Sequence, residues 1–238
     1  MCTLEKRDSL FILTLTGNNQ HRLNPTLLDA IQSALRRVRA EAATSSSSSS
    51  SVLITTAEGK FFSNGYDLAW AQSSGEINQA SQLMDAKLRS VVADLISLPM
   101  PTIAAVTGHA SAAGYILALS HDYILMRNDR GFLYMSELDI KLVIPAWFIS
   151  LVESRIGSPI ARREVVLTAA KLTAMDAVQK GIIDSAHDSA DETVMAALRL
   201  GEELVKKGWD GHVYGEIRKQ VLAGVLDKIG EINTRSKL

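Results

Sequence analysis

The sequence predicts an α/β fold with parallel strands and a helical C-terminal part. Short β-rich runs alternate with helix-like amphipathic stretches up to about residue 144, and the pattern is mainly helical from Pro145 onwards. Hydrophobic residues make up 47% of the 238 residues, which is enough for a sizeable core. No apolar run approaches the roughly 20 residues of a membrane helix, so we expect no membrane span.

The first half of the chain contains two of the predicted strands. Residues 11–16 are β-rich and end in a turn at 17–19, after which Pro25 opens an amphipathic helix. The second strand covers residues 52–56. The seven serines at 45–51 precede it, and we interpret them as a solvated loop without chemistry.

The middle of the chain continues the alternation. A helix is predicted over about residues 80–98 and is ended by the prolines that follow it. Strands are predicted at 103–106 and 123–126, and the small-residue and apolar segment 108–120 between them indicates a loop that leads into a buried helix.

The C-terminal part is mainly helical, with a break at 157–159 and glycine interruptions inside the stretch 191–228. No linker separates two independent units. We therefore predict an α/β core over residues 1–190 and a C-terminal helical segment over residues 191–238.

Charge and cysteine content exclude several classes of partner. The formal net charge is −1 with both signs mixed along the chain, so we expect neither nucleic acid nor an anionic membrane as a partner. Cys2 is the only cysteine, which rules out an internal disulfide and favours a reducing compartment. No grouping of histidine, cysteine and acidic residues has metal-ligand spacing, so no metal site is expected.

The two ends of the chain differ in targeting information. The amino terminus has no apolar segment of the kind found in secretory signals. Ser236, Lys237 and Leu238 form the C-terminal tripeptide that the peroxisomal import receptor reads. We therefore predict a peroxisomal location, with that receptor as a partner.

Two glycine-containing loops are candidates for binding a developing negative charge. Residues 59–68 follow a strand, and Gly65 permits a positive φ that turns the next N–H outward. Residues 108–114 lie between a strand and a helix, and their small side chains let a ligand approach the backbone. Two converging N–H groups would form an oxyanion hole. Ordinary turns and close helix packing explain the same residue types, so both readings stay open on composition alone.

Four motifs between residues 22 and 123 resemble segments of the crotonase (enoyl-CoA hydratase/isomerase) superfamily. Residues 62–68 (FSNGYDL) are similar to its F-S-x-G-x-D-L segment, and residues 101–110 (PTIAAVTGHA) to its P-x-I-A-A-V-x-G-x-A segment. Residues 120–123 (SHDY) match the S-x-D-x that follows, and residues 22–25 (RLNP) occupy the place of an N-terminal turn. Order and spacing agree over about residues 8–190.

The resemblance implies a crotonase-like spiral of ββα units, assembled as a homotrimer or a dimer of trimers. It implies an acyl-CoA substrate and no separate cofactor, because CoA is part of that substrate. The backbone N–H groups of Tyr66 and Ala113 would then bind the thioester oxygen. The further substrate contacts that it implies lie at Arg22, Lys60, Asn64, Gly65 and Trp147. Arg22 or Lys60 would meet the CoA phosphates, and a solvated surface charge is the alternative for each.

The carboxylates distinguish reactions within this superfamily. Hydratases use two glutamates, and the position of one is occupied here by Ile116, which cannot transfer a proton. Glu137, eight residues before Pro145, lies in a segment that resembles the Asn-Glu loop of mitochondrial-type Δ3,Δ2-enoyl-CoA isomerases. Among superfamily members, the chain most resembles the plant peroxisomal isomerases. A single base suits isomerisation.

The resemblance therefore implies a Δ3,Δ2-enoyl-CoA isomerase of unsaturated fatty-acid β-oxidation. Glu137 would remove the C2 proton of a 3-enoyl-CoA and return it at C4, giving trans-2-enoyl-CoA. Met135, Leu138 and Trp147 would raise its basicity by desolvation. Asp139, two residues away, is the rival carboxylate.

Two other functions remain open: another crotonase-type enzyme, such as a hydratase or thioesterase, and a non-catalytic acyl-CoA-binding protein. Other residues that invite a catalytic interpretation are better explained structurally. We expect His109 to pack beside the second loop, and the adjacent His121 and Asp122 to point to opposite faces of a strand. Asp67 is expected to brace the first loop.

Overall fold

The computed structural model describes residues 1–44 and 50–231, without the side chain of Thr44. The predicted targeting tripeptide 236–238 and most of the serine run lie outside the described residues. At the end of that run Ser51 is only 8% exposed, so the prediction of a wholly solvated loop is wrong there.

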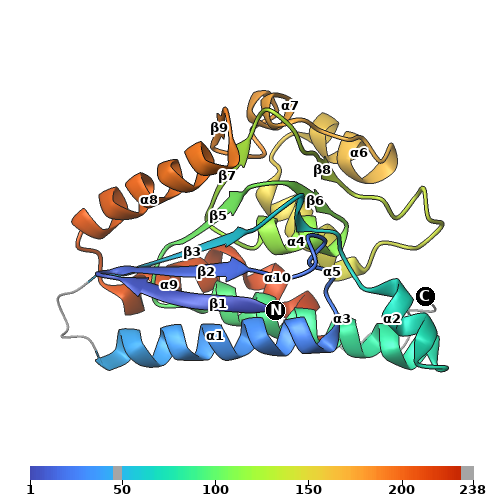
Figure 1. Cartoon of the computed structure of the whole chain (residues 1–238), viewed down its shortest axis with the longest axis horizontal. Helices are drawn as coiled ribbons and strands as arrows, with labels where there is room; N and C mark the ends of the chain where they lie inside the picture. Colours follow the sequence, from blue (N-terminus) through green and yellow to red (C-terminus); the bar gives the residue numbers. More distant parts are fainter. Residues whose placement is uncertain (45–49, 232–238) are drawn as a thin grey trace.

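The larger sheet has the strand order β1-β2-β3-β5-β7-β9 (Figure 1). Strands β1 and β2 form an antiparallel pair, and every later pairing is parallel, which confirms the predicted parallel component. The strands are β1 (Cys2–Arg7), β2 (Leu10–Leu15), β3 (Val52–Ala57), β5 (Thr102–Val106), β7 (Tyr123–Arg127) and β9 (Ser185–His187).

A smaller parallel sheet of three short strands has the order β4-β6-β8. It consists of β4 (Phe61–Ser63), β6 (His109–Ser111) and β8 (Leu133–Tyr134). Each of these strands directly follows a strand of the larger sheet, since β4 follows β3, β6 follows β5 and β8 follows β7. The chain therefore repeats one ββα step, as the resemblance implied.

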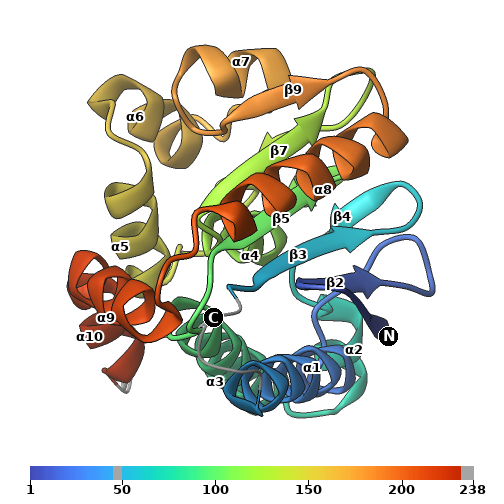
Figure 2. The ribbon, with the colours of Figure 1, turned by 90° about the vertical axis from the view of Figure 1, so that its left-hand side faces the viewer.

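Helices cover the larger sheet on both faces. Helices α1 and α3 pack against each other along one side (Figure 1), and α8 lies across β3, β5 and β7 on the opposite face (Figure 2). In the described part of the chain, no helix is both long and apolar enough to span a membrane. The helices are α1 (Pro25–Thr44), α2 (Leu68–Ser73), α3 (Ile77–Ile96), α4 (Ala113–Leu119), α5 (Ala146–Arg155), α6 (Pro159–Leu167), α7 (Ala174–Gln179), α8 (Ala190–Lys206), α9 (Gly211–Val221) and α10 (Ala223–Gly230).

The core continues on both sides of the larger sheet because side chains alternate along each strand. On β5, Ile103 and Ala105 pack with residues of α8, while Ala104 and Val106 belong to the main core on the other face. Parallel strands that are buried on both faces have nearly continuous apolar sequences. For this reason the central strands could be predicted from the sequence. The division at residue 190 stays a prediction.

Candidate active site

A cavity of about 580 Å³ lies where the two glycine-containing loops, α3 and the segment before α5 meet. It brings together four of the predicted site residues, namely Arg22, Asn64, Tyr66 and Glu137. Most of the remaining wall is apolar, which suits the acyl part of a substrate. The principal apolar contributors are Leu68, Ile140, Leu142, Val143, Ile144 and Phe148.

The first loop is aimed by the peptide between Gly65 and Tyr66. Gly65 adopts a φ of 72°, as expected for a glycine in this turn. Its carbonyl accepts a hydrogen bond of 2.8 Å from the Leu23 N–H. Because a trans peptide is planar, the Tyr66 N–H points the opposite way from that carbonyl. Among the described residues, this N–H has no hydrogen-bond acceptor.

The second loop is aimed by Ala112, which precedes α4. Its N–H donates to the Tyr134 carbonyl at 2.7 Å, and its own carbonyl accepts from the N–H groups of Tyr115 and Ile116 at 2.9 and 3.1 Å. The Ala113 N–H, in the same peptide as that carbonyl, therefore points out of the helix. Ala112 has φ 50° and ψ −124°, a strained combination for a residue with a Cβ.

The two loops are in direct contact at Gly65. A Cβ placed on this residue would lie 3.0 Å from the Ser111 carbonyl oxygen and 3.5 Å from the Ala113 nitrogen. A side chain here would be strained by the positive φ and would crowd the Ser111 carbonyl, and the short distance to the Ala113 nitrogen places the N–H groups of Tyr66 and Ala113 near each other. This placement supports the predicted oxyanion hole.

Glu137 is a buried carboxylate with an unused oxygen. Glu137 is only 6% exposed, and its Oε2 has no hydrogen-bond partner among the described residues. Desolvation raises the pKa of the Glu137 carboxyl to about 7, while a contact with its own backbone N–H opposes the shift. A group with such a pKa accepts a proton and also gives it back at neutral pH.

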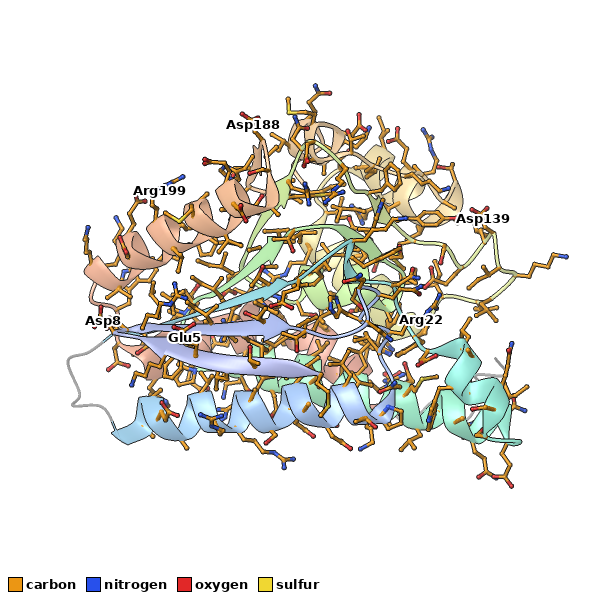
Figure 3. All side chains as sticks on the ribbon, in the orientation of Figure 1. Glu5, Asp8, Arg22, Asp139, Asp188 and Arg199 are labelled. Atoms are coloured by element: carbon orange, nitrogen blue, oxygen red, sulfur yellow. The ribbon has the colours of Figure 1, made fainter. Side chains whose placement is uncertain are left out.

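Asp139, the rival carboxylate, lies in a different environment. It is exposed on the loop that projects at the right of Figure 3, and it accepts a hydrogen bond from the Tyr134 hydroxyl. It does not belong to the lining of the cavity. The geometry therefore favours Glu137 as the base.

Three predicted substrate contacts, Lys60, Gly65 and Trp147, lie outside this lining. Lys60 extends over the Phe61 ring, with its Nζ 5.7 Å from the ring centre. Trp147 is fully buried behind the wall, and its neighbour Phe148 faces the cavity instead. The expected apolar wall around Glu137 is likewise formed by the segment before α5 and not by Met135 or Leu138, since neither belongs to the lining.

Asp85 on α3 lines the cavity and was missed by the sequence analysis. It accepts hydrogen bonds from the Tyr66 hydroxyl at 3.1 Å, from the Trp147 indole N–H at 2.9 Å and from Arg89 at 2.7 Å. The spacing of Asp85 and Arg89 permits an i,i+4 ion pair, but solvated helix faces show the same spacing, so it does not identify Asp85 as a site residue.

The histidines have structural surroundings, as expected. The His109 ring lies between those of Phe61 and Phe132, with ring centres 5.0 and 4.8 Å away. His121 is buried and forms a hydrogen bond of 2.8 Å with the Thr55 hydroxyl. The expectation that His121 lies on a strand is wrong, because β7 begins two residues later at Tyr123.

Asp67 braces the first loop, which confirms the expectation for this residue. Its Oδ1 accepts a hydrogen bond from the Trp70 N–H at 3.1 Å and so caps α2. Its Oδ2 accepts a hydrogen bond from the Asn24 side chain at 3.2 Å, which ties the loop to the start of α1.

Comparison with known proteins agrees with this site. The profile of the enoyl-CoA hydratase/isomerase family matches residues 5–221. The chain belongs to this family. This family member is 64% identical to enoyl-CoA delta isomerase 1, peroxisomal, of Arabidopsis thaliana, an alignment that covers 100% of the chain and 97% of the relative. It is 53% identical to enoyl-CoA delta isomerase 2, peroxisomal, of the same species, over 95% of each protein.

Solved structures confirm the fold of this family member. A probable enoyl-CoA hydratase, EchA3, from Mycobacterium tuberculosis superposes with a TM-score of 0.84 at 22% identity, covering 96% of this chain and 91% of that one. At this identity the likeness shows the fold alone, and it confirms the crotonase-like architecture implied by the motifs.

Proposed function

We propose that this family member is a Δ3,Δ2-enoyl-CoA isomerase. The names of its relatives support the activity, since proteins 64%, 53% and 54% identical to it are enoyl-CoA delta isomerases. The observation that carries the chemistry is Glu137, a buried carboxylate with an unpartnered oxygen in a largely apolar cavity. The loops that carry the two outward N–H groups both border this cavity, through Tyr66 and Ala112.

The reaction is a proton shift along the acyl chain. The Glu137 carboxylate removes a proton from C2 of a 3-enoyl-CoA, and the electron pair of that C–H bond moves toward the thioester carbonyl. The N–H groups of Tyr66 and Ala113 stabilise the negative oxygen of the resulting dienolate. The same proton then passes from Glu137 to C4, the double bond settles between C2 and C3, and the carboxylate is regenerated.

The environment of Glu137 suits both halves of this cycle. The carboxylate must be basic enough to take a proton from carbon, and the acid formed must then release it to carbon. Desolvation brings the pKa of Glu137 to about 7, so both forms are accessible near neutral pH.

Hydration is disfavoured by the same geometry. It requires a second group that activates or positions water, and the corresponding position is taken by Ile116, which is fully buried in the core. Asp85 is a second carboxylate of the cavity, but each of its oxygens already accepts at least one hydrogen bond. Glu137 is the carboxylate of the lining that has an oxygen without a hydrogen-bond partner among the described residues, and it is the one to which we assign the proton transfer.

The cavity also provides for the two ends of the substrate. Its apolar wall, with Ile140, Val143 and Phe148, suits the acyl chain. Arg22 and Asn64 provide polar groups on the same cavity, and Arg22 suits a CoA phosphate. In Figure 3, Arg22 lies on the same side of the molecule as the loop that carries Asp139.

The cellular setting that we propose is peroxisomal β-oxidation of unsaturated fatty acids. Two relatives carry the word peroxisomal in their names, while the third does not. The tripeptide 236–238 is the expected import signal. A fluorescent fusion that enters peroxisomes only when these three residues are present would support this location. Assembly as a homotrimer or a dimer of trimers stays a prediction, which a molar-mass measurement by light scattering would test.

The test is to incubate the purified protein with 3-hexenoyl-CoA, trans-2-hexenoyl-CoA and hexanoyl-CoA and to identify the products by chromatography. Conversion of 3-hexenoyl-CoA to trans-2-hexenoyl-CoA, with no reaction of hexanoyl-CoA, supports the isomerase function. A 3-hydroxyacyl-CoA product would instead indicate a hydratase, and free CoA a thioesterase. Binding without any product would indicate an acyl-CoA-binding protein.

A further inference from the structure

Asp85 connects three walls of the cavity through one carboxylate. Its Oδ1 accepts hydrogen bonds from the Tyr66 hydroxyl at 3.1 Å and from the Trp147 indole N–H at 2.9 Å. Its Oδ2 accepts from the Arg89 Nε–H at 2.7 Å. The carboxylate thus links the first loop, α3 and α5. Both of its oxygens therefore accept hydrogen bonds, unlike Oε2 of Glu137.

Arg89 fixes Asp85 from the other side. Its Nη1 donates to the main-chain carbonyls of Lys228 and Ile229 at 2.8 and 3.1 Å, at the end of α10. The guanidinium also lies 5.5 Å from the centre of the Trp147 ring. Arg89 is 9% exposed, so these contacts form away from solvent, where ion pairs are weakly screened. Asp85 is therefore held in one orientation.

The Tyr66 side chain is the part of the first loop that Asp85 holds. Its ring lies 6.2 Å from that of Phe148, between the loop and α5. Burial, then the nearby Asp85 carboxylate, raise the pKa of Tyr66 well above its usual value, so the hydroxyl remains a donor at neutral pH. On the backbone, Leu23 bonds to the residues on either side, through the Gly65 carbonyl and the Asp67 N–H. Side chain and backbone together define the direction of the Tyr66 N–H.

We propose that Asp85 is a positioning residue, which aims the Tyr66 backbone N–H at the thioester oxygen by anchoring the Tyr66 side chain. This inference rests on the proposed function. An oxyanion donor accelerates a reaction because it is oriented before the charge develops. If the Tyr66 N–H is free to tilt, it stabilises the transition state less well and kcat falls. The affinity for the ground-state thioester then changes little.

The first variant is Asp85→Asn, which keeps the size of the side chain but replaces one acceptor oxygen with an NH2 group. At least one of the three donors then faces another donor. We expect kcat for 3-hexenoyl-CoA to fall by between about 10-fold and about 1,000-fold, with little change in KM. Asp94→Asn is the matched control, because Asp94 is a partly buried residue on the same helix that bonds to Gln32. It should keep the wild-type kcat.

A spectroscopic readout separates positioning from a loss of stability. A chromophoric cinnamoyl-CoA thioester absorbs at longer wavelength when its carbonyl is polarised by hydrogen bonds. We expect wild type and Asp94→Asn to produce the full red shift, and Asp85→Asn to bind the thioester with a smaller one. If the wild type does not isomerise any substrate, the proposed function fails, while the red shift still tests the positioning.

Tyr66→Phe tests whether Asp85 acts through Tyr66, and it remains informative if Asp85→Asn does not fold. It removes only the hydroxyl that links the two residues. We expect it to reproduce the loss of kcat and red shift, and the double variant should be no worse than Asp85→Asn alone. An undiminished red shift in both single variants would overturn the proposal. So would additive losses in the double variant.

Discussion

Glu137 and Asp85 are carboxylates of the same cavity, and their surroundings differ in one decisive respect. Asp85 accepts three hydrogen bonds, whereas Glu137 has an oxygen without a partner among the described residues. Burial then raises the pKa of Glu137 to about 7. Two groups of the same chemical type are thus assigned to opposite tasks by their neighbours. In our proposal, one carboxylate transfers protons and the other holds the site together.

The largest effect in this comparison is expected for Glu137→Gln. Glutamine keeps the shape but cannot accept the C2 proton, so kcat should fall by about 10²- to 10⁴-fold, with the substrate still bound. The ultraviolet absorbance of the conjugated product measures the rate. Glu153→Gln, the same change at an exposed site on α5, should retain full activity. Wild-type turnover by Glu137→Gln would remove Glu137 as the base.

Gly65→Ala tests the other half of the chemistry, the contact between the two loops. Its φ of 72° and a Cβ only 3.0 Å from the Ser111 carbonyl oxygen should displace the Tyr66 N–H. We expect kcat to fall by about 10²- to 10³-fold, as when an oxyanion donor is removed.

Gly75→Ala is the control for backbone strain. Gly75 has a similar φ of 76°, but nothing lies within 4 Å of its added Cβ. This variant should lose stability by about 1 kcal/mol and keep its activity. Equal loss of activity in both variants would indicate that strain, and not the loop contact, explains the result.

Glu137→Gln should also raise the stability of the folded protein at neutral and higher pH, although it lowers the activity. The carboxyl ionises at about 7 in the folded protein and near its ordinary pKa of 4.5 when unfolded. The folded state therefore binds more protons between these values, and the unfolding free energy of the wild type falls as pH rises through them. Above about pH 7 the variant should be more stable than the wild type by up to about 3 kcal/mol.

Urea unfolding at about pH 4 and about pH 8 measures this difference in unfolding free energy. At the lower pH the two proteins should be nearly equally stable, because Glu137 is protonated in the folded state and mostly protonated in the unfolded state. A stability difference that does not depend on pH would mean that Glu137 is not held in a desolvated site.

The smallest effect is expected for Asp139→Asn. Asp139 is exposed and lies outside the cavity lining, so kcat/KM should stay within about twofold of the wild type. Steady-state kinetics with 3-hexenoyl-CoA measures it. A loss comparable to that of Glu137→Gln would show that the loop rearranges and that Asp139 takes part in catalysis.

The sequence predicted the parts of the fold with strong local patterns. Residues 52–56 and 103–106 were clear because strands buried on both faces are continuous apolar runs. The strands β4, β6 and β8 were missed because two or three residues are too few to show a period. Strand β1 was missed because it is an edge strand whose exposed residues are mostly polar.

The candidate site was predictable where motifs fix the backbone. Gly65 and Ala113 were found through the loops that contain them, and Glu137 through its resemblance to the isomerase segment. The choice between Trp147 and Phe148 depends on the rotation of α5, since adjacent helical residues point about 100° apart. Asp85 could not be assigned, because an aspartate in an amphipathic helix is usually solvated. Its burial arises only when α5 and α10 pack against α3.

The pH dependence of kcat/KM for wild type, Glu137→Gln and Asp85→Asn, measured from about pH 5 to about pH 9, tests the division of roles most directly. The account predicts that the wild-type rate rises to a plateau with a midpoint near the Glu137 pKa of about 7. Asp85→Asn should be slower with this rise retained, and the residual rate of Glu137→Gln should lack it. The same rise in Glu137→Gln, or its loss in Asp85→Asn, would contradict the account.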